Sequence, residues 1–370
     1  MRVPRIDAGR LAVLVVAALC LAGCAAERAG ACPTPPRGCT IFAVSRGERV
    51  FFGGNGDWIN FDSNYYWVDP GSETRYGAIY FGLPSNVQHG FNEKGLAYDA
   101  NGLPLAPVTD HPGREPVSGG YASYLLEILR ACATVEEVVV WVQAHRWHEA
   151  MHDQMHFADA GGDAVVISAG PGGKVAFTRK PAGDGYLVST NFNLANPANG
   201  SWPCWRYERA QALLAEIEGE GELTAERAAS VLDAVHVASP SGFTILSVLG
   251  DLPQGRIYVY LFHQFDAPIV LDVAAEIDRA ADLGRATAPR PLRELFPPET
   301  VVRVDRAYQR LMARSTRCDT VGLAWLVLVA LCNCVSEITR SEGERNDPGG
   351  ADGYQDNRGR GKSAYPAKRS

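Results

Sequence analysis

The chain has 370 residues, of which 46% are hydrophobic and 21% charged, and its net charge is -7. This composition is typical of one large globular domain with appendages, and a net negative charge argues against nucleic-acid binding. Of nine cysteines, four lie in the two hydrophobic ends of the chain. Five cysteines remain for the body of the chain, namely Cys32, Cys39, Cys132, Cys204 and Cys318. Because this number is odd, we predict at least one free thiol and no framework of disulfides.

Residues 1–24 have the pattern of an export signal. Three arginines precede the apolar run Leu11–Ala22, which ends in Leu-Ala-Gly-Cys at Cys24. This ending resembles a bacterial lipoprotein box, in which Cys24 would carry the lipid. About 12 apolar residues are fewer than the roughly 20 that span a bilayer as a helix. We therefore predict a signal peptide and an exported protein, in the periplasm or at the cell surface.

Residues 25–38 are rich in proline, glycine and alanine and have no hydrophobic periodicity. They are predicted to be a linker or a pro-segment ahead of a domain of residues 39–318. Cys32 is followed by Pro33 and no strand pattern begins there. A strand pattern does begin directly after Cys39, which makes Cys39 the better candidate for a functional thiol.

Cys39 opens a predicted β-hairpin. Two runs rich in β-branched and aromatic residues, Thr40–Val44 and Val50–Phe52, flank a turn at Gly47. Cys39 lies at the start of the first strand, and Asp57 lies just past the end of the second. An antiparallel return therefore brings the carboxylate of Asp57 near the thiol of Cys39.

The motif Cys-Thr-x-Phe followed by Gly-x-Asn-x-Asp-Trp resembles the N-terminal-nucleophile hydrolases of linear amides, the choloylglycine hydrolase and penicillin V acylase family. The resemblance covers about Cys39 to Phe262. It implies an α+β fold of four layers (αββα), two antiparallel sheets between helices, and hydrolysis of a small N-acyl amide without a cofactor or a metal. It also implies that Cys39 becomes the first residue, so that its α-amino group acts as the base and Asp57 orients that amine.

A second strand, turn and strand are predicted between Tyr76 and Pro104, with the turn at Asn92–Gly95. The segment Gly-Phe-Asn-Glu-Lys-Gly-Leu is similar to Gly-x-Asn-Glu-Lys-Gly-Leu of the same family. The resemblance places Asn101, within one residue, where these enzymes use a backbone N–H in the oxyanion hole. The alternative from these residues alone is a solvated surface hairpin.

Ser118–Ala144 is predicted to form two helices, and the sequence His-Glu-x-x-His follows. On a helix, His148 and His152 can bind zinc, with Glu149 as the base, which makes a zinc-dependent peptidase an alternative function. No Gly-x-x-His extension supplies a third ligand, and His156 is predicted to open a strand. The other interpretation is a solvated, histidine-rich helix end.

The resemblance assigns two further residues. A predicted strand ends in Asn191, whose side chain would hold the oxyanion, as the matching asparagine does in the family. Arg206 lies in the first turn of a predicted helix and would favour the thiolate of the nucleophile. The alternatives are a turn-forming asparagine and a surface arginine paired with a glutamate of the same helix.

The sequence departs from the family at one informative position. Bile salt hydrolases have Gly-Arg-Asn-x-Asp, whereas this chain has Gly-Gly-Asn-Gly-Asp from Gly53 to Asp57, so Gly54 replaces the arginine. The acyl group of the substrate is therefore left open. An exported lipoprotein that binds without catalysis is a further alternative.

After two more predicted strands, Phe243–Asp251 and Arg256–Phe262, the composition changes. Residues 319–337 contain the apolar run Val321–Val335, and residues 338–370 are polar, glycine-rich and predicted to be disordered. As a helix the run would be about 22 Å long, short of a hydrocarbon core of roughly 30 Å. The run could span a membrane, or it could be a buried helix or a helix at the membrane surface. Val321–Val335 and a lipid on Cys24 are therefore the two candidates for membrane attachment.

Overall fold

The computed structural model describes residues 38–58, 64–83, 85–109, 114–117, 121–147, 150–239 and 242–313. The predicted signal peptide, nearly all of the predicted pro-segment, the run Val321–Val335 and the predicted disordered tail lie outside these residues. Within the described ranges, no helix is long and apolar enough to cross a membrane.

The first sheet holds the N-terminal hairpin at its centre. In the described part of the chain its neighbouring strands are β12 (Gly185–Ser189), β1 (Thr40–Arg46), β2 (Arg49–Trp58), β16 (Gly242–Asp251), β17 (Arg256–Leu261) and β18 (Ile269–Asp272), and β15 (Ala238–Ser239) pairs with β16. Every pairing is antiparallel. The predicted hairpin is confirmed, but its second strand continues through Asp57 because β16 pairs with it there.

The second sheet runs in the order β11 (Val175–Arg179), β10 (Ala164–Ala169), β9 (Ala150–Ala158), β6 (Ala97–Pro107), β5 (Asn86–Asn92), β4 (Ala78–Leu83), β3 (Tyr65–Asp69) and β19 (Arg290–Pro291). Two short pairs are separate from both sheets: β13 (Phe192–Asn193) with β14 (Asn196–Gly200), and β7 (Glu115–Pro116) with β8 (His145–Arg146).

The turn between β5 and β6 is where the sequence predicted it, and although Glu93 and Lys94 are exposed, the turn is not merely solvated. Asn92 is buried, and its side-chain oxygen accepts hydrogen bonds from the backbone N–H groups of Lys94 and Leu96. Its side-chain nitrogen donates to the carbonyls of Leu129 and Cys132. One asparagine thus closes the turn and fixes the hairpin to the helix beside it, which overturns the surface-hairpin alternative.

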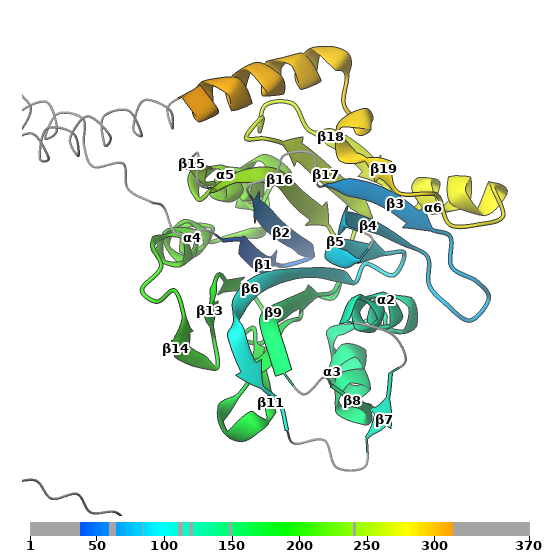
Figure 1. The fold of residues 1–370 in the computed structure, drawn as a ribbon, viewed down its shortest axis with the longest axis vertical. Coiled ribbons are helices and arrows are strands. Elements are labelled where there is room, and N and C mark those ends of the chain that lie inside the picture. The colour runs from blue at the N-terminus through cyan, green and yellow to red at the C-terminus, as the bar shows by residue number, and fades with distance from the viewer. Residues whose placement is uncertain are drawn as a thin grey trace, which may run out of the picture. The chain divides into compact units, whose positions relative to one another are not determined.

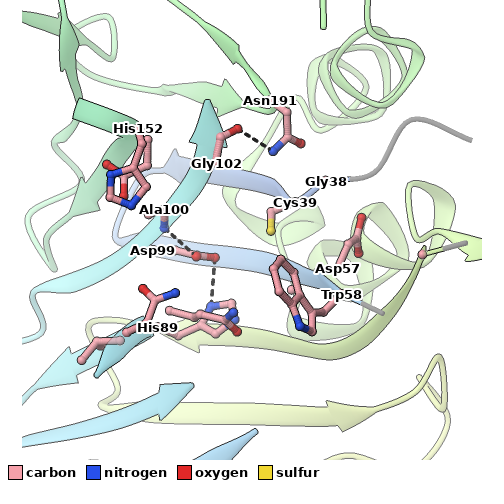
Figure 2. Close-up of a pocket in the computed structure, with 16 residues that line it drawn as sticks. Gly38, Cys39, Asp57, Trp58, His89, Asp99, Ala100, Gly102, His152 and Asn191 are labelled. Atoms are coloured by element: carbon pink, nitrogen blue, oxygen red, sulfur yellow. Dashed lines mark hydrogen bonds and ion pairs between the residues drawn. The ribbon is translucent and has the colours of Figure 1, made fainter. Parts of the chain in front are cut away.

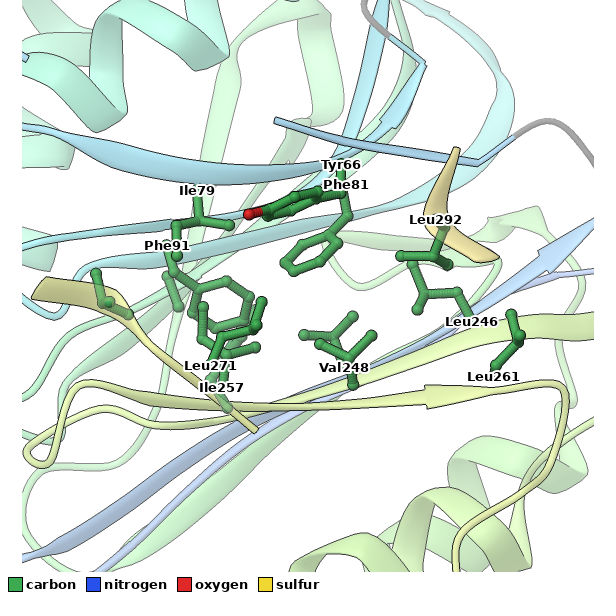
Figure 3. Packing of buried hydrophobic residues seen from close by; sticks show 14 of the residues in the cluster. Tyr66, Ile79, Phe81, Phe91, Leu246, Val248, Ile257, Leu261, Leu271 and Leu292 are labelled. Atoms are coloured by element: carbon green, nitrogen blue, oxygen red, sulfur yellow. The ribbon is translucent and has the colours of Figure 1, made fainter. Parts of the chain in front are cut away.

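Helices cover the outer faces of both sheets (Figure 1). α2 (Tyr121–Ala131) and α3 (Val135–Ala144) pack on the second sheet, and α4 (Trp205–Ala215) and α5 (Ala225–Ala234) pack on the first. Between the sheets lies a further apolar cluster (Figure 3), to which α6 (Val273–Asp282) and the helical residues 298–313 also contribute. Single 3₁₀ turns are η1 (Pro171–Gly173), η2 (Glu220–Glu222) and η3 (Leu292–Leu295). The predicted four-layer αββα arrangement is confirmed.

The predicted histidine-rich helix end is wrong for His152. α3 ends at Ala144, and β9 begins at Ala150, earlier than the strand start predicted at His156. The strand begins early because β6 pairs with it as far as Pro107, opposite Ala150. This pairing partner lies far away in sequence, and local residue preferences did not indicate it.

Candidate active site

A cavity of about 360 Å³ lies where the N-terminal hairpin of the first sheet meets β5, β6 and β9 of the second (Figure 2). Three of the five predicted site residues line it, namely Cys39, Asp57 and Asn191. Trp58, at the end of β2, and Gly242, at the start of β16, also line it. The cavity is therefore built at the place where the sequence predicted a site.

Cys39 is a partly exposed residue, and no disulfide partner is present for its thiol in the described part of the chain. The register of the hairpin sets Thr40 opposite Asn55, so Cys39 comes next to Gly56 and Asp57 as predicted. Desolvation and the charges of two aspartates raise the pKa of the Cys39 thiol to about 12, against the lowering effects of a backbone hydrogen bond from Asp57 and of Arg206. At neutral pH this thiol is protonated and needs a base.

Asp57 is 7% exposed and has only one of its oxygens engaged. The Thr244 hydroxyl donates to Oδ1 over 2.5 Å, whereas Oδ2 has no hydrogen-bond partner among the described residues. Desolvation raises the pKa of Asp57 to about 7, although Arg206 and Thr244 lower it. A buried carboxylate oxygen without a partner is costly, and it is ready to accept a hydrogen bond from a cationic donor beside Cys39.

Arg206 is fully buried in the first turn of α4, which rules out the surface-arginine alternative. Its Nη1 donates to the Gly38 carbonyl, to the Cys39 carbonyl over 2.6 Å and to Thr40 Oγ1 over 3.0 Å. Its Nη2 donates to Asn191 Oδ1 over 3.1 Å. The guanidinium therefore holds the carbonyl groups on both sides of the Gly38–Cys39 junction.

Asn191 follows β12 and lies next to the same junction, at Gly38. Its Nδ2 donates to the Gly102 carbonyl over 2.9 Å. A Cβ added to Gly38 would lie 1.7 Å from Asn191 Oδ1, and Gly38 has a φ of +144°, a conformation that residues with side chains rarely adopt. Position 38 therefore requires glycine as long as Asn191 keeps this place.

Asn101 lies in β6 with its side chain fully buried. Neither its side-chain oxygen nor its nitrogen has a hydrogen-bond partner within the described residues. The cavity is lined by its two neighbours, Ala100 and Gly102, and not by Asn101 itself. The structure thus brings the backbone of this segment to the site, and the oxyanion role of the Asn101 N–H stays a prediction.

His89 and Asp99 form a buried pair in contact with each other, which the sequence did not lead us to predict. His89 Nδ1 lies 2.9 Å from Asp99 Oδ2, and the two side chains are 1% and 2% exposed. The backbone N–H of Ala100 donates to Asp99 Oδ1 over 2.6 Å. Burial raises the pKa of Asp99, against the opposing effect of His89. A signal was present, because His89 and Asp99 are directly opposite each other when the residues are counted back from the predicted turn.

Thr244 was missed as well, and no local signal could have found it. It reaches Asp57 because β16 pairs with β2, with Thr244 opposite Asp57. These residues are 187 positions apart in the chain.

The zinc alternative finds no support in the geometry. His148 and Glu149 lie outside the described residues, and His152 lies in β9. The motif needs a helix, because only a helical turn brings histidines four positions apart onto one face. In the part of the chain that the structure describes, no group of three or more histidine, cysteine or carboxylate side chains could hold a metal ion.

Comparison with known proteins places the chain in a family. Residues 44–260, more than half of the chain, match the family described as acyl-coenzyme A:6-aminopenicillanic acid acyl-transferase. No curated protein sequence matches the chain significantly.

Two similar solved structures belong to the group that the sequence resembles. A variant of the conjugated bile acid hydrolase from Clostridium perfringens has a TM-score of 0.51 and 16% identity, over 64% of this chain and 93% of that chain. Penicillin V acylase from Agrobacterium tumefaciens has a TM-score of 0.47 and 18% identity, over 64% of this chain and 86% of that chain. The resemblance recognised in the sequence is confirmed, and the chain belongs to the acyl-coenzyme A:6-aminopenicillanic acid acyl-transferase family, with the four-layer fold of N-terminal-nucleophile hydrolases.

Proposed function

We propose that this protein is an exported cysteine N-terminal-nucleophile hydrolase that cleaves the linear, non-peptide amide bond of a small N-acyl substrate. One observation carries the proposal. The thiol of the partly exposed residue Cys39 lies beside Asp57, a buried carboxylate with one oxygen lacking a partner within the described residues, and Arg206 holds the backbone on both sides of the Gly38–Cys39 bond. This arrangement suits a nucleophile that becomes the first residue of the mature chain.

Cleavage of the Gly38–Cys39 bond would supply the missing base. It frees an α-amino group with a reference pKa of about 7.7–8.0, close to a working pH near neutrality. Asp57 Oδ2 is the nearby acceptor that would orient this amine. Without the cleavage, the thiol keeps its raised pKa of about 12 and has no amine beside it.

The reaction would then proceed in two steps. The Cys39 sulfur attacks the acyl carbonyl while the α-amine takes the thiol proton and passes it to the leaving nitrogen, which departs as an amine. Water then attacks the thioester carbonyl and gives one proton to the α-amine; the carbon–sulfur bond breaks, the carboxylic acid leaves, and the α-amine returns the proton to the Cys39 sulfur. Asn191 has two N–H groups and Gly102 uses one, so the other is available to the oxyanion, together with the backbone N–H proposed for Asn101.

Acyl transfer is a second candidate function, and the family match over residues 44–260 favours it, since that family is named for an acyl-transferase. An amine in place of water could take the acyl group from the same thioester. Hydrolysis and transfer are separated by adding an amine acceptor to the assay. A hydrolase forms free acid at an unchanged rate, whereas a transferase forms a new amide in its place.

Intact-mass measurement tests the proposed maturation. Purified wild-type protein is expected to begin at Cys39, and Cys39→Ala is expected to retain the residues before that position. A fully active protein that still carries Gly38 would contradict the mechanism, because its Cys39 nitrogen is part of a peptide bond and cannot act as a base.

Export and membrane attachment belong to the proposal as well. Because cleavage before Cys39 would separate the mature chain from a lipid on Cys24, we propose that Val321–Val335 retains it at the membrane. Deleting Val321–Ser370 should move active enzyme into the soluble fraction. If the shortened protein is insoluble and inactive, the run belongs to the core, and if the full-length mature chain is already soluble, the run anchors nothing.

A further inference from the structure

The charged side chains that line the cavity are mostly acidic. Asp57, Asp99 and Asp153 all line it, and each is more than nine-tenths buried. Two histidines, His89 and His152, also line it. Within the described residues that form the lining, there is no lysine and no arginine.

Arg206 does not change this balance on the substrate side. It is fully buried and is not part of the lining, and its Nη groups donate to the backbone at positions 38 and 39 and to two side chains. In the proposed mechanism the α-amine is a neutral base, and when it is protonated it pairs with Asp57, so it adds no cation beyond the charge of that carboxylate.

A carboxylate occupies the space next to Gly54. A Cβ added to Gly54 would lie 1.9 Å from Asp99 Oδ2, and a Cβ added to Gly56 would lie 3.3 Å from His89 Nε2. The two glycines of β2, Gly54 and Gly56, therefore leave room for the Asp99 and His89 side chains of the opposite sheet. In the motif compared above, bile salt hydrolases have an arginine at the position of Gly54. Here that position has no side chain, and the carboxyl group of Asp99 occupies the space beside it.

Two residues of the cavity lining also have buried polar atoms without a hydrogen-bond partner among the described residues. Asp57 Oδ2 and His89 Nε2 are buried and have no hydrogen-bond partner among the described residues, and both side chains line the cavity (Figure 2). Figure 2 shows Cys39 between Asp57 and Asp99. A substrate bound at the thiol is thus close to both carboxylates.

We infer that the substrates are N-acyl amides that carry no negative charge, with an uncharged or cationic group next to the scissile bond. The inference rests on the proposed function, since it takes this cavity as the active site. An anionic group would lose its hydration in the cavity among three carboxyl groups, and the described lining has no guanidinium or ammonium to pair with it. Discrimination of this kind comes from repulsion of the wrong ligand.

Alkylation of Cys39 tests the charge preference without knowledge of the substrate. Iodoacetamide and iodoacetate attack the same sulfur and differ by one negative charge. The rates are measured by mass spectrometry on the full-length wild-type protein as purified, and each is divided by the rate with glutathione. We expect iodoacetate to be at least about tenfold slower on this scale, because its carboxylate loses hydration in the cavity and has no cation on the described lining to pair with.

Variants that lack one carboxylate test whether the cavity causes the difference between the two alkylation rates. Asp153→Asn and Asp99→Asn keep the side-chain shape, and each should reduce the difference between the two reagents by about threefold. Asp153→Asn decides the matter if Asp99→Asn does not fold. Asp278→Asn is the matched control, because it removes an exposed carboxylate of α6 that is not part of the cavity lining, and it should leave the ratio unchanged.

Substrates matched in shape complete the test. N-phenylacetylglycinamide and N-phenylacetylethylenediamine should be cleaved with a higher kcat/KM than N-phenylacetylglycine. Equal alkylation rates, or preferred cleavage of the glycine conjugate, would overturn the inference and leave the proposed function standing. A Cys39 that reacts with neither reagent, in a protein that cleaves no amide, would overturn the proposed function and the inference with it.

Discussion

The space between the two sheets has two halves that differ in chemistry. The apolar half is filled by hydrocarbon side chains, among them Ile79, Phe81, Leu246, Val248 and Leu261 (Figure 3). The polar half, at the end near Cys39, contains buried polar side chains that include His89, Asp99, Asn101, Gln154 and His156. The same pair of sheets thus stabilises the fold at one end and desolvates charged groups at the other.

Strand β2 shows how one element takes part in both halves. Its alternate residues face the space between the sheets, and the first two, Val50 and Phe52, belong to the apolar cluster. The next two on the same face are Gly54 and Gly56, above which the Asp99–His89 pair is placed. Because two glycines follow Val50 and Phe52 on this face of β2, there is room for the ionisable side chains of Asp99 and His89 from the opposite sheet.

Burial in the polar half favours the uncharged form of the groups it contains. Desolvation raises the pKa of Asp57 to about 7 and lowers the pKa of His156 to about 3. His156 is held by Ser189, whose hydroxyl lies 3.0 Å from Nδ1. The comparison teaches that the apolar half should govern stability and the polar half activity and pH dependence.

The largest expected effect separates the two proposed kinds of catalysis. Cys39→Ala should lower hydrolysis of N-acyl amides by at least about a thousandfold, since it removes the nucleophile. His148→Ala should remain within a fewfold of the wild type. Kinetic assays on a panel of N-acyl amines measure both. An inactive His148→Ala together with an active, chelator-sensitive Cys39→Ala would establish the zinc peptidase instead.

The next effect concerns the apolar half alone. Phe81 is fully buried, and Phe81→Ala should lower the free energy of unfolding by about 3–5 kcal/mol, through lost burial and the cavity left behind. Urea unfolding measures this loss. At temperatures where the variant is folded, the pH profile of its activity should match that of the wild type. A shifted profile with unchanged stability would contradict the division between the two halves.

The smallest effect is a pH dependence of the uncleaved chain. The folded-state pKa of Asp57, about 7, lies above the ordinary aspartate value of 3.8, so the folded state binds this proton more tightly than the unfolded state. Stability is then highest below about pH 4 as far as this group is concerned, and it falls by a few kcal/mol at most as the pH rises to about 7.

Cys39→Ala, which should stay uncleaved, is the background in which to measure this fall. Urea unfolding at pH 5 and pH 8 should show less loss of stability for Cys39→Ala with Asp57→Asn than for Cys39→Ala alone. In the mature enzyme, the α-ammonium beside Asp57 should reduce the fall. Equal losses in both uncleaved proteins would show that Asp57 is not the buried acid that this geometry describes.

The parts of the site that are built from residues close together in the chain could be predicted from the sequence. Cys39 and Asp57 meet through one hairpin, and the turn at Asn92 fixed the next hairpin, so both could be predicted from turn residues and strand patterns. The same turn also determines that His89 lies opposite Asp99, but this is seen only when residues are counted outward from the turn along both strands. Thr244 and the early start of β9 depend on strands that pair across long stretches of chain, and short-range patterns do not specify such partners.

Arg206 holds the Gly38 carbonyl, and so the residue that precedes Cys39 is kept in the site until the chain is cleaved. In the uncleaved chain, Gly38 forms part of the cavity wall, and the Cys39 nitrogen is an amide. Under the proposed function, the newly made chain is a latent enzyme, and breaking one bond both widens the cavity and creates the base. If that bond breaks only after export, the amides of the producing cell are protected from the enzyme by the timing of its own synthesis.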